Sequence, residues 1–466
     1  MKNRTVGTLL ALALVVWPAC SRRADGPPGT GDFRSAVDRL REAGLTGERA
    51  YEILKRITSV GPRLTGSPRA AEAVEISLKL MEEMGLRNVH AEPVEVGRWI
   101  RGEVAEAFVA ADGARAAVPL AVCALGGSVG TPGEGLVAPV VEVRSLAEAA
   151  SLGKAAEGRI VFFNRPMDRR LTEPFAAYGG AADQRVGGAS TAARVGAVAV
   201  LVRSLTFRVD GNPHTGLVTY DGDAPRIPAA AIATADADAL SDLLKRDGDV
   251  SVSLRMDCRD GGRVLSANVV GELPGTERPE EIVLVGGHLD SWDLSVGAHD
   301  DAAGCAASLE AVALLKDLGL RPRRTVRAVF FMDEESGGTG GRAYAADPRR
   351  QGERHIVAAE ADRGGFAPIG LAVGRKGGRA LGMMEALESL FRPLGVSFIV
   401  PGGGGVDVAP LVARGAVPAA VIPGSQAYFD VHHSALDVDG SVHPRELELQ
   451  AIILAALAYI LAQEGI

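Results

Sequence analysis

The stretch that decides the fold is residues 281–300, EIVLVGGHLDSWDLSVGAHD. Its apolar run at residues 282–285 predicts a buried strand, because a short continuous apolar run suits a strand that is covered on both faces. His288 and Asp290 follow at the carboxyl end of this strand. A strand that ends in residues able to bind a metal or carry a proton indicates a functional site at one edge of a sheet.

Two further apolar runs end in acidic residues. Residues 326–332 are followed by Glu334 and Glu335, and the shorter run 356–359 is followed by Asp362. In open α/β sheets, sites form outside the carboxyl ends of the strands. The three strand ends are therefore expected to bring a histidine, paired glutamates and an aspartate to one crevice, which we interpret as the active site.

The ligand types in this crevice favour a divalent metal, with zinc expected. Zinc accepts imidazole nitrogen and carboxylate oxygen, and a catalytic zinc keeps one position open for water. Cobalt or manganese could occupy the same ligands. A cluster so rich in carboxylates can hold two metals if one carboxylate bridges them. Asp300 suits the bridging role, since it follows a Gly-Ala turn and precedes the Ala-rich stretch 302–315, a predicted helix.

The residues beside these candidates suggest further roles. Asp290 stands two residues after His288, where its carboxylate is expected to hold the imidazole as an outer partner. Glu334 and Glu335 end a strand and enter a Gly-rich turn, so at least one carboxylate is expected to point into the crevice. Adjacent carboxylates can divide the work, one binding metal and the other taking a proton from water.

Three choices stay open at the level of the sequence. Glu360, two residues before Asp362, competes with it as a ligand. His432 and His433 form a pair of which only one is expected to bind metal, while the other lines the pocket. His299 precedes the predicted bridging residue and has no role that its position defines.

Length and composition bound the class of protein. The chain has 466 residues, of which 47% are hydrophobic and 23% charged, so it can bury a sizeable core in two or three domains. The formal net charge is −8, and no basic stripe with interleaved aromatic residues stands out. Nothing in these features favours nucleic acid as a partner, and an acidic balance is ordinary for the surface of a soluble enzyme.

The first 20 residues predict a signal peptide. A basic start, MKNR, precedes an apolar segment at residues 6–16 and the sequence WPAC. Lipidation at Cys20, which would anchor the protein to a membrane, and ordinary cleavage near Ala19 both stay open. In either case we expect export, as a periplasmic, membrane-anchored or secreted protein. Residues 21–32 are expected to be a linker.

The remaining chain predicts an α/β fold with an inserted smaller β-rich domain. Residues 33–105 and 263–466 alternate helix and strand patterns, as in a mixed, mostly parallel sheet flanked by helices. Residues 106–262 contain short β-like runs between Gly and Pro, and we interpret them as an insert that acts as a lid or selects substrate, or is structurally inert. The apolar helix at residues 445–463 is expected to be a buried closing helix.

Cysteine usage adds little. Cys305 lies in the Ala-rich predicted helix and is expected to be a small core residue. Cys123 and Cys258 could pair in an oxidising compartment. No spacing in the chain resembles a thiolate zinc site.

Five motifs in order resemble the co-catalytic zinc exopeptidases of the bacterial leucine aminopeptidase type, a superfamily that includes carboxypeptidase Q. The insert is similar to a protease-associated domain. HDDAAG and FDVHHS look closest to the carboxypeptidase Q branch. The motifs are His288-Leu289-Asp290, Gly297-Ala298-His299-Asp300, Glu334-Glu335, Asp362 and His433-Ser434-Ala435-Leu436-Asp437.

The resemblance implies a site with two zinc ions per chain. One zinc would take His288, Asp300 and Asp362, and the other Asp300, Glu335 and His433. Glu334 would be the general base, with Asp290 as its catalytic neighbour. Water between the two metals would be the nucleophile.

The function that this resemblance implies is hydrolysis of dipeptides or of terminal residues by a metallopeptidase. An aminopeptidase acting on longer peptides and an amide deacylase on the same scaffold are the alternatives. A non-catalytic binding protein is a third, although every ligand position of the motif set is retained. Relatives in the carboxypeptidase Q branch look dimeric, so a homodimer is expected by resemblance alone.

Overall fold

The computed structural model of the protein describes residues 30–111 and 116–466. The predicted signal peptide, with its lipidation site at Cys20, lies outside the described residues, as does most of the predicted linker. Whereas the sequence predicts a linker as far as residue 32, helix α1 (Thr30–Leu45) begins inside it. The last proline, Pro28, precedes that start, so nothing in the following residues blocks helix formation.

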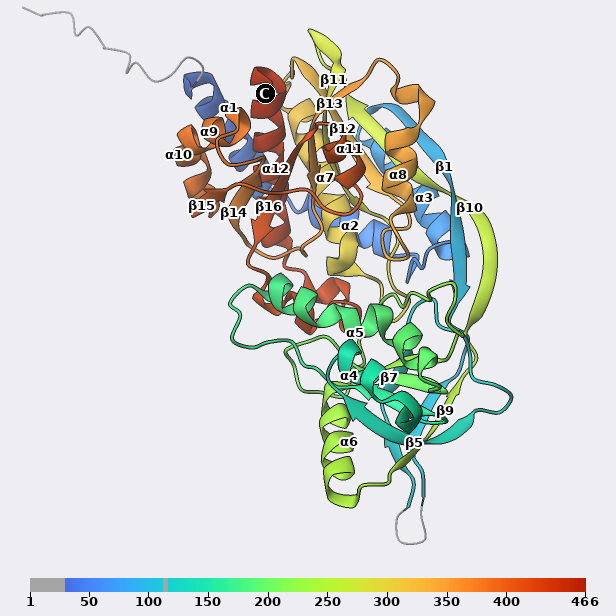
Figure 1. Ribbon diagram of the computed structural model, residues 1–466. Coiled ribbons are helices and arrows are strands. Elements are labelled where there is room, and N and C mark those ends of the chain that lie inside the picture. The colour runs from blue at the N-terminus through green and yellow to red at the C-terminus, as the bar shows by residue number, and fades with distance from the viewer. Residues whose placement is uncertain (1–29, 112–115) are drawn as a thin grey trace, which may run out of the picture.

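The larger part of the molecule is built on a mixed eight-stranded sheet (Figure 1). The four central strands, β12, β11, β13 and β16, are mutually parallel, while the edges carry antiparallel strands. The α/β fold class expected from the sequence is therefore confirmed. The order across the sheet is β1 (Arg87–Ile100), β10 (Arg259–Leu273), β12 (Arg324–Phe331), β11 (Arg278–His288), β13 (Arg354–Glu360), β16 (Val417–Pro423), β14 (Pro368–Val373) and β15 (Phe398–Val400).

Helices cover both faces of this sheet. One face packs its apolar side chains against α1, α2 (Arg49–Thr58), α3 (Pro68–Glu83), α7 (Ala303–Asp317), α9 (Arg379–Ala386), α10 (Glu388–Phe391) and α12 (Pro444–Glu464). The other face packs against α8 (Thr339–Ala346) and α11 (Ala409–Ala413). Residues buried on both sides explain why the central strands are continuous apolar runs.

Helix α12 closes the core. It is long and apolar enough to cross a membrane by length and composition, but 78% of its apolar window is buried inside the protein. It contacts α7, α1 and the sheet. This burial agrees with the expected closing helix.

A second eight-stranded sheet is built from residues 105–256. Its order is β3 (Val118–Leu120), β2 (Ala105–Val109), β9 (Ser251–Met256), β5 (Leu136–Val143), β6 (Ile160–Phe163), β7 (Ala199–Arg203), β8 (Ala229–Ile232) and β4 (Val122–Ala124), with helices α4 (Leu146–Ser151), α5 (Pro174–Arg194) and α6 (Thr234–Asp247). The paired strands β1 and β10 carry the chain into and out of this sheet (Figure 1). The assignment of residues 106–262 to a protease-associated domain stays a prediction.

Helix α5 has 21 residues, although its Ala- and Gly-rich first half shows no apolar periodicity. The helix start is nevertheless well defined, because the Glu173 carboxylate accepts a hydrogen bond from Ala176 N and Pro174 occupies the first turn.

The cysteines do not pair. Cys123 and Cys258 are both free and buried, as is Cys305. Cys123 packs into the apolar cluster on one face of the second sheet and Cys258 into the cluster on the other face. The sheet therefore separates the two thiols that the sequence left open to a disulfide.

Candidate metal centre

The candidate ligands gather at the carboxyl edge of the four central strands. His288 is the last residue of β11, Asp362 follows β13, and Glu335 follows β12. His433 follows β16 through the short helix η5 (Ser425–Asp430). Because these strands are parallel neighbours, their ends meet at one edge. The structure thus brings the expected residues into one crevice.

Asp300 lies at the centre of this group. Its Oδ1 is 3.1 Å from His288 Nε2, and its Oδ2 is 3.1 Å from His433 Nε2. His288 Nε2 is also 3.7 Å from Asp362 Oδ1, and His433 Nε2 is 3.1 Å from Glu335 Oε2. Two imidazole–carboxylate clusters therefore share one carboxylate, each through a different oxygen.

Two more residues come within reach of the same clusters. The ligand atoms of Asp300, His432 and His433 lie within 4.8 Å of one another, as do those of His288, Asp301 and Asp362, and those of His288, Asp300 and Glu335. The Asp301 carboxylate is already occupied, since it accepts hydrogen bonds from the backbone N–H groups of His288 and Gly304. Asp301 therefore positions the start of α7 and the end of β11.

The two adjacent histidines differ in what surrounds them. Their rings stack with centres 3.5 Å apart, and His432 Nε2 is 3.5 Å from Asp300 Oδ2. His433 alone faces both Asp300 and Glu335. His432 instead packs among aromatic rings, including Tyr178. This arrangement favours His433 as the ligand, with His432 as its neighbour.

The donor atoms fit a divalent metal. Glu335 Oε1 is buried and accepts no hydrogen bond within the described residues, and Asp300 Oδ2 faces only the imidazole nitrogens of His432 and His433. Buried carboxylate oxygens without a partner are costly, so a cation is the natural partner for them. Imidazole nitrogen and carboxylate oxygen are ligands that zinc accepts.

His288 is oriented by its own loop. Its Nδ1 lies 3.0 Å from the backbone carbonyl of Asp290, so Nδ1–H can donate there and leave Nε2 free to bind metal. The sequence instead predicts the Asp290 carboxylate as the outer partner. That carboxylate is 3.8 Å from the imidazole and is occupied elsewhere.

The carboxylate of Asp290 holds the Glu334-Glu335 turn. It accepts hydrogen bonds from the backbone N–H groups of three successive residues at 2.8–3.3 Å, namely Asp333, Glu334 and Glu335. The hydroxyl of Thr65 donates to it at 2.6 Å. Asp290 is fully buried, so these four donors compensate its charge. It therefore positions the glutamate pair rather than the imidazole.

Asp437 holds the bridging residue in the same way. Its carboxylate accepts hydrogen bonds from the N–H groups of His299 at 2.6 Å and Asp300 at 3.1 Å. The His299 ring stacks on Phe366, and its Nδ1 accepts a hydrogen bond from Gly365 N. His299 is thus a packing residue of the loop and faces away from the ligand cluster.

The second sheet contributes contacts that the sequence does not predict. Thr215 N donates to the carbonyl of His433 at 2.9 Å, and His214 Nδ1 lies 2.7 Å from the carbonyl of His432. His433 has φ 61°, in the left-handed region that is unfavourable for a residue with a side chain. Hydrogen bonds from residues more than 200 positions away therefore hold the ligand's backbone.

Charges in the site shift one another's protonation. Burial alone would lower the pKa of His433, but the carboxylates of Glu335 and Asp300 outweigh it and raise that pKa well above the ordinary value. Burial, together with the nearby carboxylates of Asp362 and Glu335, raises the pKa of Glu334 well above its ordinary value. A protonated His433 offsets part of the negative charge of the carboxylates. The raised pKa of Glu334 makes its carboxylate a stronger proton acceptor.

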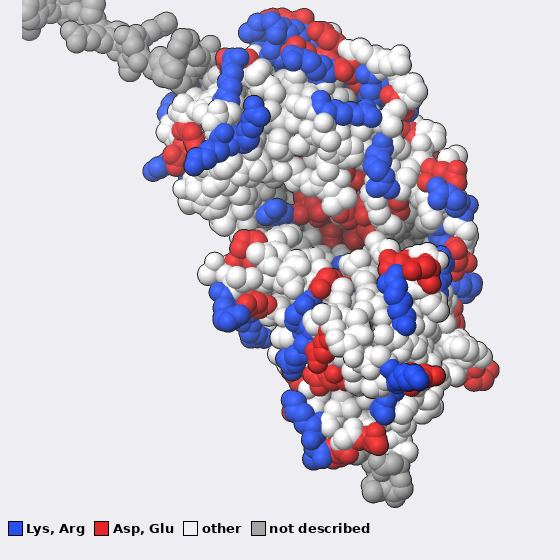
Figure 2. Space-filling model, viewed as in Figure 1, with Lys and Arg blue, Asp and Glu red and all other residues white. Residues whose placement is uncertain are grey.

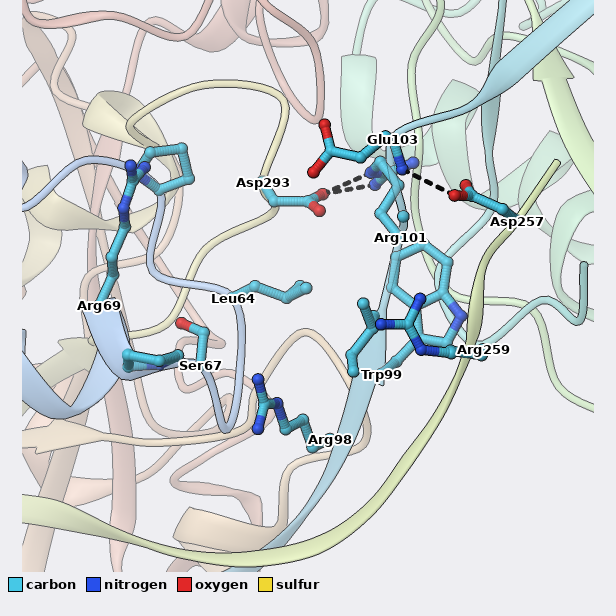
Figure 3. A pocket seen from close by; sticks show the side chains of 14 residues that line it. Leu64, Ser67, Arg69, Arg98, Trp99, Arg101, Glu103, Asp257, Arg259 and Asp293 are labelled. Atoms are coloured by element: carbon cyan, nitrogen blue, oxygen red, sulfur yellow. Dashed lines mark hydrogen bonds and ion pairs between the residues drawn. The ribbon is translucent and has the colours of Figure 1, made fainter.

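A second cavity lies apart from this site. Figure 2 shows Asp and Glu side chains gathered in a hollow between the two parts of the molecule. A cavity of about 460 Å³ lies elsewhere, where β1 leaves the first sheet, and contains none of the candidate ligands. There the Arg101 guanidinium pairs with Asp293, and Arg98, Arg69 and Arg259 line the walls (Figure 3).

Comparison with known sequences gives a consistent result. The family model described as peptidase family M28 matches residues 268–457. The chain is 36% identical to carboxypeptidase Q of Bos taurus over 433 residues, which cover 93% of this chain and 89% of the relative. It is 35% identical to carboxypeptidase Q of Homo sapiens over 434 residues, with the same coverage.

Solved structures agree with the sequences. A peptidase M28 precursor from Shewanella amazonensis superposes with a TM-score of 0.89 and 33% identity, covering 94% of this chain and 98% of that one. A zinc aminopeptidase from Bacillus subtilis has a TM-score of 0.65 at 20% identity, covering 90% and 96%. The second likeness bears on the fold alone.

Proposed function

Because the chain belongs to peptidase family M28, it is a metallopeptidase, and we propose that it is a dinuclear zinc exopeptidase acting on dipeptides. The observation that carries the proposal is the position of Asp300, whose two oxygens face different imidazoles, each at 3.1 Å. A carboxylate shared in this way supports two metal ions, which in such sites are about 3.5–4 Å apart.

The residues divide into two ligand sets around the shared carboxylate. His288, Asp300 and Asp362 would hold one zinc, and Asp300, Glu335 and His433 the other. This division follows the shorter distances in each cluster. Neither ligand set uses Glu334, which is adjacent to the ligand Glu335 and partly exposed.

Glu334 is the proposed general base. When bound, zinc polarises the scissile carbonyl and makes water a stronger nucleophile. The Glu334 carboxylate takes the proton from that water and then passes it to the leaving amine. The hydrogen bonds from the turn to Asp290 fix the backbone of Glu334, so its carboxylate stays oriented during the transfer.

Dipeptides are the proposed substrate class. The curated relatives at 35–36% identity are named carboxypeptidase Q, whereas the likeness to aminopeptidases is at 20–21% identity and concerns the fold. Small, acid-lined surroundings at the ligand cluster also favour a short substrate whose amine is positively charged.

The test is a substrate panel on zinc-loaded protein with a chelator control. The panel contains a free dipeptide, its N-acetyl derivative, an aminoacyl anilide and a longer peptide. We expect cleavage of the free dipeptide only, abolished by chelator and lost in Glu334→Gln, which keeps its zinc. Stepwise trimming of the longer peptide would indicate an aminopeptidase instead, and cleavage of only the acetylated compound would indicate a deacylase.

A further inference from the structure

Arg363 stands beside the candidate ligand Asp362 on the loop that follows β13. Its side chain is half-buried, and its guanidinium carbon lies 4.7 Å from the centre of the Phe175 ring. Phe175 is in the first turn of α5, which belongs to the second sheet's part of the chain. The contact therefore joins the two parts of the molecule next to the metal centre.

The Phe175 ring is held from the other side by the segment that carries His433. It stacks on Tyr428 with ring centres 5.3 Å apart and meets Phe429 edge-on at 5.0 Å. Both partners are buried in η5, four and five residues before His433. The Phe175 ring thus contacts two segments that each lead to a candidate zinc ligand, Asp362 beside Arg363 and His433 after η5.

No hydrogen bond or ion pair within the described part of the chain uses the Arg363 guanidinium. Two buried arginines of this protein use their N–H groups instead. Arg63 donates to three backbone carbonyls of the loop 289–297, and Arg327 pairs with two glutamates. Arg363 is held only through the face of its guanidinium, so the N–H groups at its edge are left for another partner.

We infer that Arg363 binds the free carboxylate of the substrate, an inference that rests on the proposed peptidase function. The planar fork of a guanidinium matches a carboxylate with two parallel hydrogen bonds. The hollow around the metal cluster is otherwise rich in carboxylates, which repel an anion (Figure 2). A fixed cation beside Asp362 offsets that repulsion at one point of the site.

The position of the carboxylate depends on the length of the substrate. In a dipeptide the carboxylate is one residue from the scissile carbonyl, a span of about 4 Å, and each further residue adds about 3.5 Å. Arg363 directly follows the candidate ligand Asp362 in the chain. A cation on this loop therefore suits a carboxylate close to the scissile bond better than one at the end of a long peptide.

The experiment compares a dipeptide with its C-terminal amide on zinc-loaded full-length protein. We expect wild type to favour the free carboxylate by about 10- to 100-fold in kcat/KM, the range that hydrogen bonds between charged groups are worth. Arg363→Gln should lose this preference through a higher KM for the dipeptide, with little change in kcat and none for the amide, because the carboxylate does not react. Arg363→Lys should restore part of it.

Two controls make the outcomes distinct. Arg375→Gln removes an exposed arginine after β14, at the opposite end of the first sheet, and should behave as wild type. Equal cleavage of dipeptide and amide by wild type would overturn the carboxylate assignment and leave the peptidase function standing. Cleavage of neither, with zinc bound, would overturn the proposed function itself. Equal losses in both arginine variants would reduce the effect to overall charge and also overturn the assignment.

Discussion

Replacing Asp290 by asparagine should loosen the turn that carries Glu334 and Glu335 while leaving every ligand atom in the sequence. The carboxylate takes two donors on each oxygen: the N–H groups of Asp333 and Glu334 on Oδ1, and Thr65 Oγ1 and the N–H of Glu335 on Oδ2. An amide can keep the first pair on its oxygen. Its NH₂ then meets the N–H of Glu335, so two donors oppose each other.

The magnitude follows from these bonds. The lost hydrogen bond to a charged acceptor is worth about 1.5–3 kcal/mol, and the N–H of Glu335 left buried without an acceptor costs about 1–3 kcal/mol. We therefore expect Asp290→Asn to destabilise the metal-free protein by about 2.5–6 kcal/mol. Displacement of the turn should also weaken zinc binding about 10- to 100-fold, as changes to partners of ligands do. Turnover should fall at least about 100-fold, because the base moves with the turn.

Thermal unfolding in excess chelator measures the first effect without the contribution of bound zinc. A competition titration with a chromophoric chelator measures the second. Asp257→Asn is the matched control, since this exposed carboxylate also accepts two backbone N–H groups, at 2.9 and 3.1 Å, but far from the ligands. It should change neither zinc affinity nor turnover. If Asp290→Asn has the melting temperature, zinc affinity and turnover of the wild type, Asp290 does not hold the Glu334-Glu335 turn.

Other expected outcomes concern the ligand pair, a buried carboxyl and the thiols. His433→Ala should lower the zinc content of the protein, and His432→Ala should lower it far less, since only His433 faces two carboxylates. Elemental analysis measures the zinc content, and the reverse result would reassign the ligand. Burial raises the pKa of Glu448 to about 8, so the folded state binds that proton more tightly than the unfolded state, and stability falls as pH rises from about 4.5 to 8. Glu448→Gln keeps an acceptor for Ala50 N and should increase the free energy of unfolding at pH 8.5 by up to about 4–5 kcal/mol, but not at pH 4.5. The melting temperature should rise accordingly at pH 8.5, and equal melting curves at that pH would contradict this. Cys123 and Cys258 are free and buried, so an alkylating reagent should label them in the unfolded protein without prior reduction, but not in the folded protein. Peptide mass spectrometry measures the labelling, and a disulfide-linked pair of peptides would contradict the fold.

Much of the site was predictable because its information is local. Three of the four central parallel strands, β11, β12 and β13, contain an apolar run that is followed within a few residues by a histidine or a carboxylate, so the sequence indicates both the strand and the edge at which these side chains appear. This reasoning places His288, Glu335 and Asp362 together from three separate runs. The choice between His432 and His433 could not be made in this way, because neighbours on an irregular segment leave no periodic pattern to separate them.

The role of Asp290 shows where local reasoning fails. Its spacing from His288 predicts a contact with the imidazole, and the backbone carbonyl does make one. The carboxylate instead turns to the end of β12, more than 40 residues away in the chain. Four donors outcompete one imidazole for a buried charge, and no pattern within either segment records that competition.

The second sheet is the part whose role the sequence leaves open between a lid and an inert insert. Its contacts favour neither a passive insert nor a lid that opens freely. Thr215 and His214 bond the carbonyls of the His432-His433 pair, and Phe175 contacts Arg363 beside Asp362. Moving this part away would release the backbone of one proposed ligand and the guanidinium beside another. We therefore expect any opening of this part to weaken metal binding as well.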